Sequence, residues 1–315
     1  MIEIGFLVSG IMGLVVGTEI AVTHGAVLAR HYKLSDLFIG IVFFAIATDL
    51  PELVVAIDAG MRNLEGQQVS GLVLGNSLGS CFAQIGLTLG LLGLRSRLKL
   101  SKGSCFFYGT LALGSLALLF LLSYFGQVTR LAGVVLIVSY FLYLGLLYRR
   151  EVPPHKKENS NSSIRLWQSW LGVVGGLALV IFSSDLTITA IVYLANVLKI
   201  DQTLIAIVVL GAGTSLPELS LSLTALRKEK IDMAVGNIIG SNIFDTLLPI
   251  GASAAIHPLV VEPALTGFDL PALFFLTLVV FLFFLRSRGI GKLESVTIIL
   301  IYLFYLLHKG LNGGV

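Results

Sequence analysis

Two acidic blocks interrupt stretches of the sequence that are otherwise strongly apolar. Each block places a Thr, a second polar residue and a Glu at positions i, i+1 and i+4, which share one face of a helix. The blocks are Thr48-Asp49-x-x-Glu52 and Thr214-Ser215-x-x-Glu218. A proline precedes each Glu, and proline deprives the carbonyl one turn earlier of its hydrogen-bond donor. We therefore expect free backbone carbonyls over 45–47 and 211–213, including those of Ala45 and Gly211.

Two further polar series run along the apolar stretches that follow these blocks. Each series has three polar residues spaced by four, which forms a stripe along one helix face. The series are Asn76, Ser80 and Gln84, and Asn237, Ser241 and Asp245. Glycines at 75, 79, 236 and 240 let neighbouring backbones approach closely. This packing would bring the stripes against the acidic blocks.

All of these groups are oxygen ligands, and no His or Cys converges on them. Carboxylate, hydroxyl, amide and carbonyl oxygens suit Ca²⁺, Na⁺ or Mg²⁺ better than zinc or copper. Acids at mid-depth in a membrane are costly when ionised unless a cation or a proton accompanies them. The pattern predicts a cation site. The alternative is that the polar residues only hydrogen-bond helices together.

The composition excludes an ordinary soluble globular protein. The 315 residues are 56% hydrophobic and 12% charged, whereas a soluble domain has about 25% charged residues. The mean hydropathy is +0.94, and a helix needs about 20 apolar residues to cross the hydrocarbon core. The sequence predicts an all-α membrane protein with ten transmembrane helices at 2–28, 34–61, 68–94, 105–124, 128–148, 168–197, 203–226, 231–256, 268–285 and 293–308.

The basic residues are distributed unevenly between the connections of these spans. If the ten spans alternate, 17 of the 21 Lys and Arg residues fall on one side, which the positive-inside rule makes cytoplasmic. The other side receives Arg62, Arg130, Lys199 and Lys309. We expect a multi-pass protein of the plasma (inner) membrane with both termini outside. The basic clusters are interpreted as topology signals and not as nucleic-acid sites.

An internal repeat relates the two halves of the chain. Residues 18–53 align with 184–219 at a constant offset of 166 with 12 identities in 36 positions, and GNSLGS (75–80) matches GNIIGS (236–241). A hydrophilic, proline-bearing stretch divides the chain into a five-helix repeat at 1–149, a cytoplasmic linker at 150–166 and a second repeat at 167–315. Five spans per repeat invert the second copy, an architecture typical of secondary transporters with a midplane site.

These motifs resemble those of the cation/calcium exchanger superfamily, and in particular its sodium/calcium exchanger branch in the prokaryotic form with two alpha-repeats. The likeness covers essentially the whole chain, and GTSLPEL…GNIIGSNIFD (213–245) is its most specific part. The resemblance implies a secondary active antiporter that exchanges Ca²⁺ for Na⁺ by alternating access. The first and sixth spans would slide against the remaining helices.

The resemblance also implies roles for individual residues. Glu52 and Glu218 would hold a central Ca²⁺ with oxygens of Thr48 and Thr214. Flanking Na⁺ sites would use Ser80, Ser215, Ser241 and the carbonyls of Ala45 and Gly211. Gln84 and Asp245 fall where the family places an Asn or Asp in each repeat, and Asn76 and Asn237 complete the predicted set.

The first repeat departs from the family pattern at two of these positions. Asp49 stands where the family usually has a small hydroxyl residue, and Gln84 stands where it usually has Asn. The interval from the Glu to this amide is 32 residues, against 27 in the second repeat. An added carboxylate raises the negative charge of the site, so coupling to H⁺ or K⁺, or another divalent substrate, stays open as an alternative.

Other classes of protein fit the sequence less well. A passive cation channel could use the same ligands, but channels commonly need several subunits, whereas one chain here holds both half-sites. No nucleophile–base pair or Gly-x-Ser-x-Gly, His-Glu-x-x-His or Gly-x-Gly-Asp motif indicates an enzyme. A non-transporting scaffold is the remaining class. We expect no resident cofactor, a lipid bilayer and transported cations as partners, and a monomer as the transport unit.

Three other polar residues lie in the first and sixth spans. Glu19 and Asp185 occupy equivalent repeat positions, and could either line an ion pathway or form structural pairs. His24 has an Ala at its equivalent position, 190. We interpret His24 as a buried histidine and not as a ligand.

Overall fold

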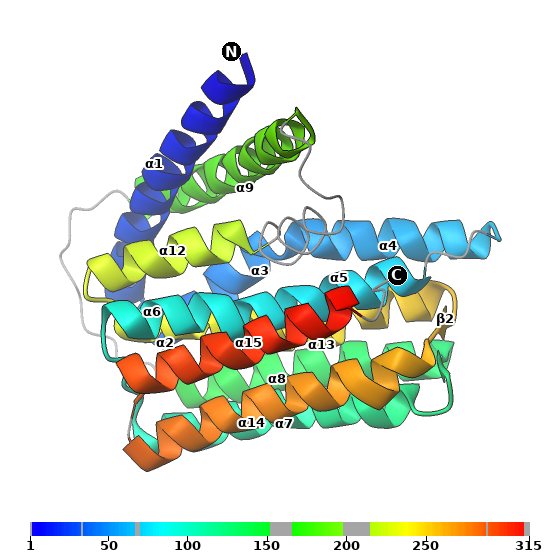
Figure 1. The fold of residues 1–315 in the computed structure, drawn as a ribbon. Coiled ribbons are helices and arrows are strands. Elements are labelled where there is room, and N and C mark those ends of the chain that lie inside the picture. The colour runs from blue at the N-terminus through cyan, green and yellow to red at the C-terminus, as the bar shows by residue number, and fades with distance from the viewer. Residues whose placement is uncertain are drawn as a thin grey trace.

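The protein is a bundle of long helices (Figure 1). The computed structural model describes residues 2–32, 34–66, 70–151, 166–197, 215–287 and 289–311. The first half contains α1 (Ile2–His31), α2 (Asp36–Phe38), η1 (Ile39–Phe44), α3 (Ala45–Thr48), α4 (Leu50–Leu64), α5 (Ser70–Phe82), η2 (Ala83–Thr88), α6 (Leu89–Arg95), α7 (Lys102–Ser123), β1 (Gln127–Val128) and α8 (Arg130–Glu151). The second half contains α9 (Leu166–Val197), α12 (Leu216–Arg227), α13 (Ile231–Ile256), β2 (Leu259–Val260), η4 (Leu265–Asp269), α14 (Leu270–Ser287) and α15 (Lys292–Leu311).

The helices agree closely with the predicted spans. In the described ranges, eight helices are long and apolar enough to cross a membrane, or nine when one bent pair counts as a span. Part of the predicted seventh span, over 203–214, lies outside the described residues, as does most of the linker. The division of the chain at 150–166 therefore stays a prediction.

The predicted second span is broken at the first acidic block. The helix formed by α2, η1 and α3 is bent by 45° from α4. The break falls at Asp49, whose φ of −90° and ψ of 0° lie outside the helical region. Pro51 stands in the first turn of α4, where its missing N–H would have had no partner in the helix. The proline therefore starts a new helix at the bend.

Helix α13 is the central element, and it packs closely against the broken helix. A Cβ added at Gly240 would lie 2.7 Å from the carbonyl oxygen of Ile41, and one at Gly236 would lie 2.6 Å from that of Leu37. A Cβ at Gly40 would overlap the carbonyl of Met233. These glycines let the two backbones touch, as predicted for 236 and 240.

The equivalent glycines of the first repeat show no such contact with described atoms. No described atom lies within 4 Å of a Cβ built at Gly75 or Gly79. The offset of 166 places the segment 203–207 opposite them, and that segment lies outside the described residues. The prediction of close packing at 75 and 79 therefore stays untested.

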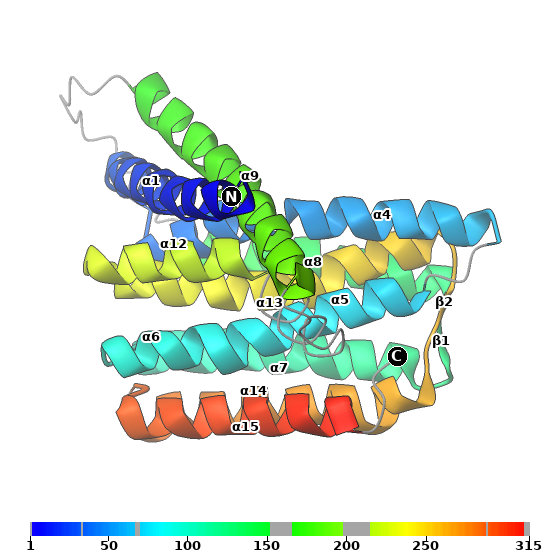
Figure 2. The same ribbon diagram turned by 45° about the horizontal axis from the view of Figure 1, so that its top comes forward.

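Helices α1 and α9 form a separate pair that crosses the other helices at a steep angle (Figures 1 and 2). Small residues bring the two backbones together. A Cβ at Gly17 would lie 2.9 Å from the carbonyl oxygen of Gly176, and one at Gly176 would lie 2.8 Å from that of Gly17. The reciprocal contact makes α1 and α9 one closely packed unit on the surface of the remaining bundle.

Two short backbone pairings join connections at opposite ends of the bundle. Strands β1 and β2 pair antiparallel at the right-hand end in Figure 1. An isolated bridge between Leu98 and Ile290 joins the connection after α6 to the one after α14. The first pairing links the fourth and eighth connections between spans, and the second links the third and ninth. An inverted repeat relates these connections, because it exchanges the third with the eighth and the fourth with the ninth.

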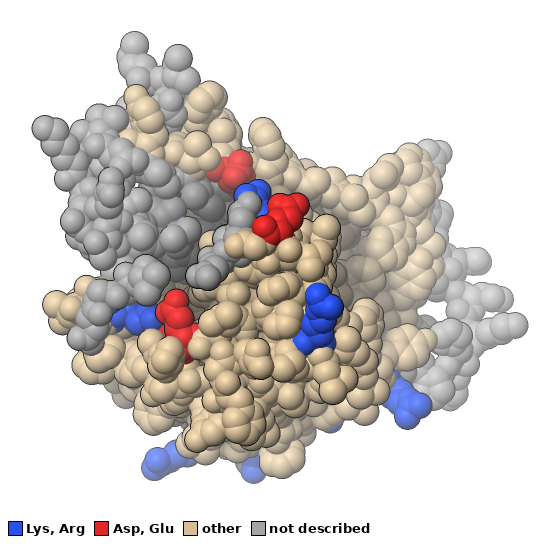
Figure 3. All heavy atoms as spheres, turned by 90° about the vertical axis from the view of Figure 1, so that its right-hand side faces the viewer, with Lys and Arg blue, Asp and Glu red and all other residues tan. Residues whose placement is uncertain are grey.

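The charge asymmetry also agrees with the arrangement of the helices. Helices α1, α6, α8, α12 and α14 each have a basic residue in their last turn, and all five end at the left of Figure 1. Figure 3 shows the opposite end, where Lys and Arg side chains are few. The described basic residues therefore concentrate at one end, as the positive-inside rule requires.

Candidate cation site

The four acids of the predicted site lie buried in the middle of the bundle. Asp49 stands at the bend before α4, and Glu52 follows in the first turn of that helix. Glu218 stands in the first turn of α12, and Asp245 lies within α13. Glu52 is 7% exposed and the other three side chains are fully buried. The four carboxylates lie close enough together to repel one another.

The two acidic blocks adopt the same local structure. Asp49 has φ −90° and ψ 0°, and Ser215, its equivalent, has φ −93° and ψ 10°. Pro51 and Pro217 each stand in the first turn of the following helix. The Glu that follows each proline therefore lies at the positive end of a helix dipole, which favours a carboxylate. Each copy of the sequence repeat therefore forms one half of the site.

Oxygen atoms of this cluster lack hydrogen-bond partners among the described residues. They are both carboxylate oxygens of Asp49 and of Glu218, one of Glu52, one of Asp245, Oδ1 of Asn237 and Oγ of Ser241. Buried polar atoms are nearly always hydrogen-bonded in native proteins, and an unpaired buried charge is strongly destabilising. A set of buried, unpaired oxygens is the environment that a hard cation compensates.

The carboxylates do not form a metal cluster by themselves. In the described part of the chain, no group of three or more His, Cys, Asp or Glu side chains is arranged to hold a metal ion. A cation at this place must therefore take neutral oxygens as well. Two predicted sources of such oxygens, Gly211 and Thr214, lie outside the described residues.

The sequence matches a family of known transporters over nearly its whole length. Residues 2–149 and 168–310 match the model of the family described as sodium/calcium exchanger protein. The chain belongs to the sodium/calcium exchanger family.

Individual relatives of the exchanger family match the chain from end to end. The sodium/calcium exchanger MaX1 of Methanosarcina acetivorans is 29% identical, with 97% of this chain and 98% of MaX1 covered. The inner membrane protein YrbG of Escherichia coli is 27% identical, with 93% of each chain covered. A solved structure of the sodium–calcium exchanger NCX_Mj, soaked with Na⁺ and Ca²⁺, has a TM-score of 0.84 at 25% identity and covers 98% of both chains.

These matches confirm the predicted family, fold and class of function. The protein is an all-helical, multi-pass membrane protein with the exchanger fold of ten spans in two repeats. It is a cation antiporter and not an enzyme.

Hydrogen bonds within the broken helix orient the hydroxyl of Thr48. Its Oγ1 donates to the carbonyl oxygens of Phe44 and Ala45, at 3.0 and 3.2 Å. The hydroxyl proton is therefore engaged with the backbone, and the oxygen keeps lone pairs for a cation. The Ala45 carbonyl also accepts from the backbone N–H of Asp49 at 3.0 Å. The expectation of a free carbonyl at Ala45 was wrong, because Pro51 removes only the donor to the carbonyl four residues earlier, at Ala47, and leaves the N–H of Asp49 to bond Ala45.

The serines of the predicted sites come together across the repeat boundary. Ser80 Oγ and Ser215 Oγ lie 3.4 Å apart, and both side chains are buried. Ser241 is fully buried, and its Oγ is one of the unpartnered oxygens. The structure therefore joins a hydroxyl from each half of the exchanger.

The two Asn residues of the predicted stripes have different environments. Asn237 is fully buried and its Nδ2 donates to the carbonyl oxygen of Glu218 at 3.2 Å and to Ser222 Oγ at 3.0 Å. Asn237 therefore holds the start of α12 against α13. Asn76, its counterpart, is only half-buried. The role of Ser222 was not predicted from the sequence.

Gln84 makes contacts that the sequence did not indicate. It lies in the π-helix η2, fully buried, and its Nε2 donates to Asp245 Oδ2 at 3.1 Å. Asn242 donates to Gln84 Oε1 at 2.8 Å. Sequence reasoning missed Asn242. The available signal was its equivalent in the first repeat, Cys81, which differs from it in chemistry. Cys81 Sγ lies 3.6 Å from the Asn242 carbonyl oxygen, to which it donates.

The structure also shows the environments of Glu19, His24 and Asp185. Glu19 on α1 forms an ion pair with Lys228 at the end of α12, and so it serves as a structural pair. A Cβ built at Gly172 of α9 would overlap the ring of His24, which places His24 in the contact between α1 and α9. His24 is half-buried there, not buried as predicted, and its Nδ1 has no hydrogen-bond partner among the described residues. Asp185 is exposed on α9, and the described residues offer it no ion-pair partner.

Proposed function

We propose that the protein exchanges Ca²⁺ for Na⁺ across the inner membrane by alternating access at the cation site. The observation that carries the proposal is the set of buried, unpartnered carboxylate oxygens near the starts of α4 and α12. Glu52 and Glu218 supply two charges, and hydroxyl oxygens complete a cage of the kind that Ca²⁺ prefers. Na⁺ competes for the same carboxylates, which couples the two ions.

The other predicted residues fit this proposal as supporting ligands. Thr48, Ser80, Ser215 and Ser241 offer hydroxyl oxygens toward the acids, and Asn237 offers its side-chain oxygen. Thr214 and the Gly211 carbonyl complete the second half-site by the repeat. A single chain holds both half-sites, which supports a monomer as the transport unit.

The unit of α1 and α9 is the moving part in this proposal. It is closely packed within itself and lies across the surface of the other helices (Figure 2). Sliding of this unit would expose the site alternately to the two sides. The end that carries most basic residues faces the cytoplasm in this arrangement, and YrbG is named as an inner membrane protein.

The test is uptake of radioactive Ca²⁺ into proteoliposomes under defined gradients. Vesicles loaded with Na⁺ are compared with vesicles loaded with K⁺, loaded with acid, or without any gradient. We expect uptake that follows the Na⁺ gradient. Uptake driven only by the pH or K⁺ gradient, or no Ca²⁺ movement, would contradict Na⁺ coupling while leaving the family assignment unchanged.

A second coupling ion is favoured by one specific observation. Asp49 is a fourth acid in the site, fully buried, and neither of its carboxylate oxygens has a partner among the described residues. Its charge is costly at this depth unless an ion compensates it. We therefore keep H⁺ or K⁺ as an additional coupling ion alongside Na⁺.

Replacement of Asp49 by Ser tests this coupling directly. In the unmodified protein we expect Na⁺-driven Ca²⁺ uptake to be stimulated by K⁺ or by a pH gradient. In Asp49→Ser the ratio of stimulated to unstimulated uptake is expected to fall to about one, because the additional charge that needs compensation is gone. Asp58→Ser is the matched control, since Asp58 lies on the same helix but is exposed and paired with Arg62. An unchanged ratio in Asp49→Ser would exclude a second ion at this residue.

A further inference from the structure

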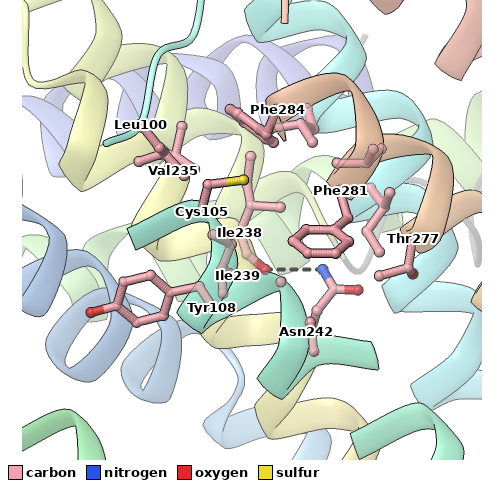
Figure 4. A pocket seen from close by; sticks show the side chains of 15 residues that line it. Leu100, Cys105, Tyr108, Val235, Ile238, Ile239, Asn242, Thr277, Phe281 and Phe284 are labelled. Atoms are coloured by element: carbon pink, nitrogen blue, oxygen red, sulfur yellow. Dashed lines mark hydrogen bonds between the residues drawn. The ribbon is translucent and has the colours of Figure 1, made fainter. Parts of the chain in front are cut away.

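The amide of Gln84 is held in one orientation by a chain of hydrogen bonds. Asn242 Nδ2 donates to the backbone carbonyl of Ile238 at 2.9 Å (Figure 4). A backbone carbonyl can only accept, so the amino group and not the oxygen of Asn242 must face it. The same amino group donates to Gln84 Oε1 at 2.8 Å. The oxygen of Gln84 is therefore bound to Asn242, and its amino group is turned to Asp245.

This orientation changes what Gln84 can do in the site. An amide oxygen facing the acids would be a cation ligand, as the sequence predicted. The amino group instead donates to Asp245 Oδ2 at 3.1 Å, and a hydrogen bond to a charged group is stronger than one to a neutral group. Only the second oxygen of Asp245 is left unpartnered.

We infer that Asn242 is a positioning residue that turns the Gln84 amino group onto Asp245, and that Gln84 thereby excludes a monovalent cation from one oxygen of that carboxylate. The inference rests on the proposed function and specifies how many oxygens remain for Na⁺ at this end of the cluster. The monovalent site is then built around Asp49 and the free oxygen of Asp245, and not around the residue at position 84.

The departures from repeat symmetry agree with this assignment. Gln84 is equivalent to Asp245, Cys81 to Asn242 and Asp49 to Ser215. Each half of the site therefore has one acid besides its Glu, but at non-equivalent positions. In each of the first two pairs, the two residues contact each other across the repeats. Position 84 has an amide where the second repeat has an acid, and position 49 has an acid where the second repeat has a hydroxyl.

The experiment is a double-mutant cycle with Asn242→Asp and Gln84→Met. In Asn242→Asp the ionised carboxylate has no donor and accepts from the Gln84 amino group, which turns the Gln84 oxygen toward Asp245. Two oxygens that face each other are stabilised by a cation between them. Met has the length of Gln but no amide. In the Gln84→Met background, Asn242→Asp therefore adds negative charge without reorienting an amide.

The readout is thermal stabilisation of the purified full-length protein by Na⁺ at constant ionic strength, because a ligand of the folded state raises the unfolding temperature. This measurement reports on a variant even when transport is lost. We expect Asn242→Asp to lower the half-stabilising Na⁺ concentration by about tenfold. In the Gln84→Met background the same substitution should change that concentration by less than about twofold.

Control variants separate this mechanism from general packing. Thr277→Val is the matched control, because Thr277 lines the same mainly apolar cavity as Asn242 (Figure 4) and its hydroxyl bonds its own helix at 2.8 Å. We expect no change in Na⁺ dependence. Gln84→Met alone is the second measurement if Asn242→Asp does not fold, and it is expected to lower the half-stabilising concentration by freeing an oxygen of Asp245.

The possible outcomes decide between the inference and the function on which it rests. An equal shift by Asn242→Asp in both backgrounds would attribute the effect to added charge and overturn the inference. No shift in Gln84→Met, or an equal shift in Thr277→Val, would also overturn it. Failure of the unmodified protein to be stabilised by Na⁺ or to take up Ca²⁺ in the proteoliposome assay would instead contradict the proposed function.

Discussion

Glu218→Gln and Glu52→Gln are each expected to lower Ca²⁺ uptake at least about a hundredfold, since each removes one of two charges proposed to bind the divalent ion. Gln has nearly the same shape as Glu, so packing around the site is retained. Both Glu218 oxygens and one Glu52 oxygen are buried without a hydrogen-bond partner among the described residues. The loss is therefore a loss of charge and not of structure. Uptake of radioactive Ca²⁺ into proteoliposomes measures it.

The same substitutions are expected to raise the stability of the cation-free protein. In the absence of cations, ionisation of these neighbouring buried carboxyl groups is unfavourable, and Gln, which cannot ionise, removes that destabilising interaction. We expect an unfolding temperature several degrees higher in a chelator, by roughly the amount that about 1–2 kcal/mol gives in a protein of this size. A decrease in Ca²⁺ uptake together with an increase in unfolding temperature is the diagnostic result.

The control for these variants is Glu65→Gln. Glu65 is exposed and ends α4 at the connection to α5. It should leave both uptake and unfolding temperature unchanged. Transport by Glu218→Gln at more than a tenth of the normal rate would show that this carboxylate is not a central ligand.

Gly40→Val is expected to have the largest effect on folding. A Cβ at this position would overlap the carbonyl of Met233 and lie 2.8 Å from the backbone nitrogen of Asn237. Both atoms belong to the backbone of α13 and cannot move as a flexible side chain can. We expect a loss of at least about 3 kcal/mol, at the upper end of the range for overpacked cores. Thermal unfolding of the detergent-solubilised protein measures this loss.

Transport should fall together with stability in this variant. Displacement of η1 from α13 would separate the bend at Asp49 from Asp245, because the first half-site is carried by the same broken helix. Gly145→Val on α8 is the control, since no described atom lies within 4 Å of a Cβ there. Equal stability and equal uptake in the two variants would refute close backbone contact as the device that joins the half-sites.

The interior of α13 shows why such contacts matter for this fold. Lipid tails are as apolar as the side chains of the spans, so helices in a membrane associate through close packing and hydrogen bonds. Gly236 and Gly240 supply the close packing, and Asn237 and Asn242 supply hydrogen bonds to α12 and η2. One helix therefore joins both half-sites.

The sequence by itself determined the membrane class, the positions of the spans, the inversion of the repeat and the four acids. These features follow from local composition and from pattern. A helix that crosses the hydrocarbon core must satisfy its own backbone and be apolar over a known length, so hydropathy reveals it. An aligned duplication with an odd number of spans must be inverted, and acids in such spans are too costly to be incidental.

Only the tertiary structure decided what the polar groups do. Glu19 is a partner of Lys228 because α1 lies across the end of α12, which no spacing along the chain indicates. The Ala45 carbonyl is occupied because the helical hydrogen bonds continue as far as the N–H of Asp49. An amide carries both a donor and an acceptor, so the sequence alone predicted Gln84 as a ligand. The carbonyl of Ile238, acting through Asn242 on a helix of the other repeat, determines which end of that amide faces the acids.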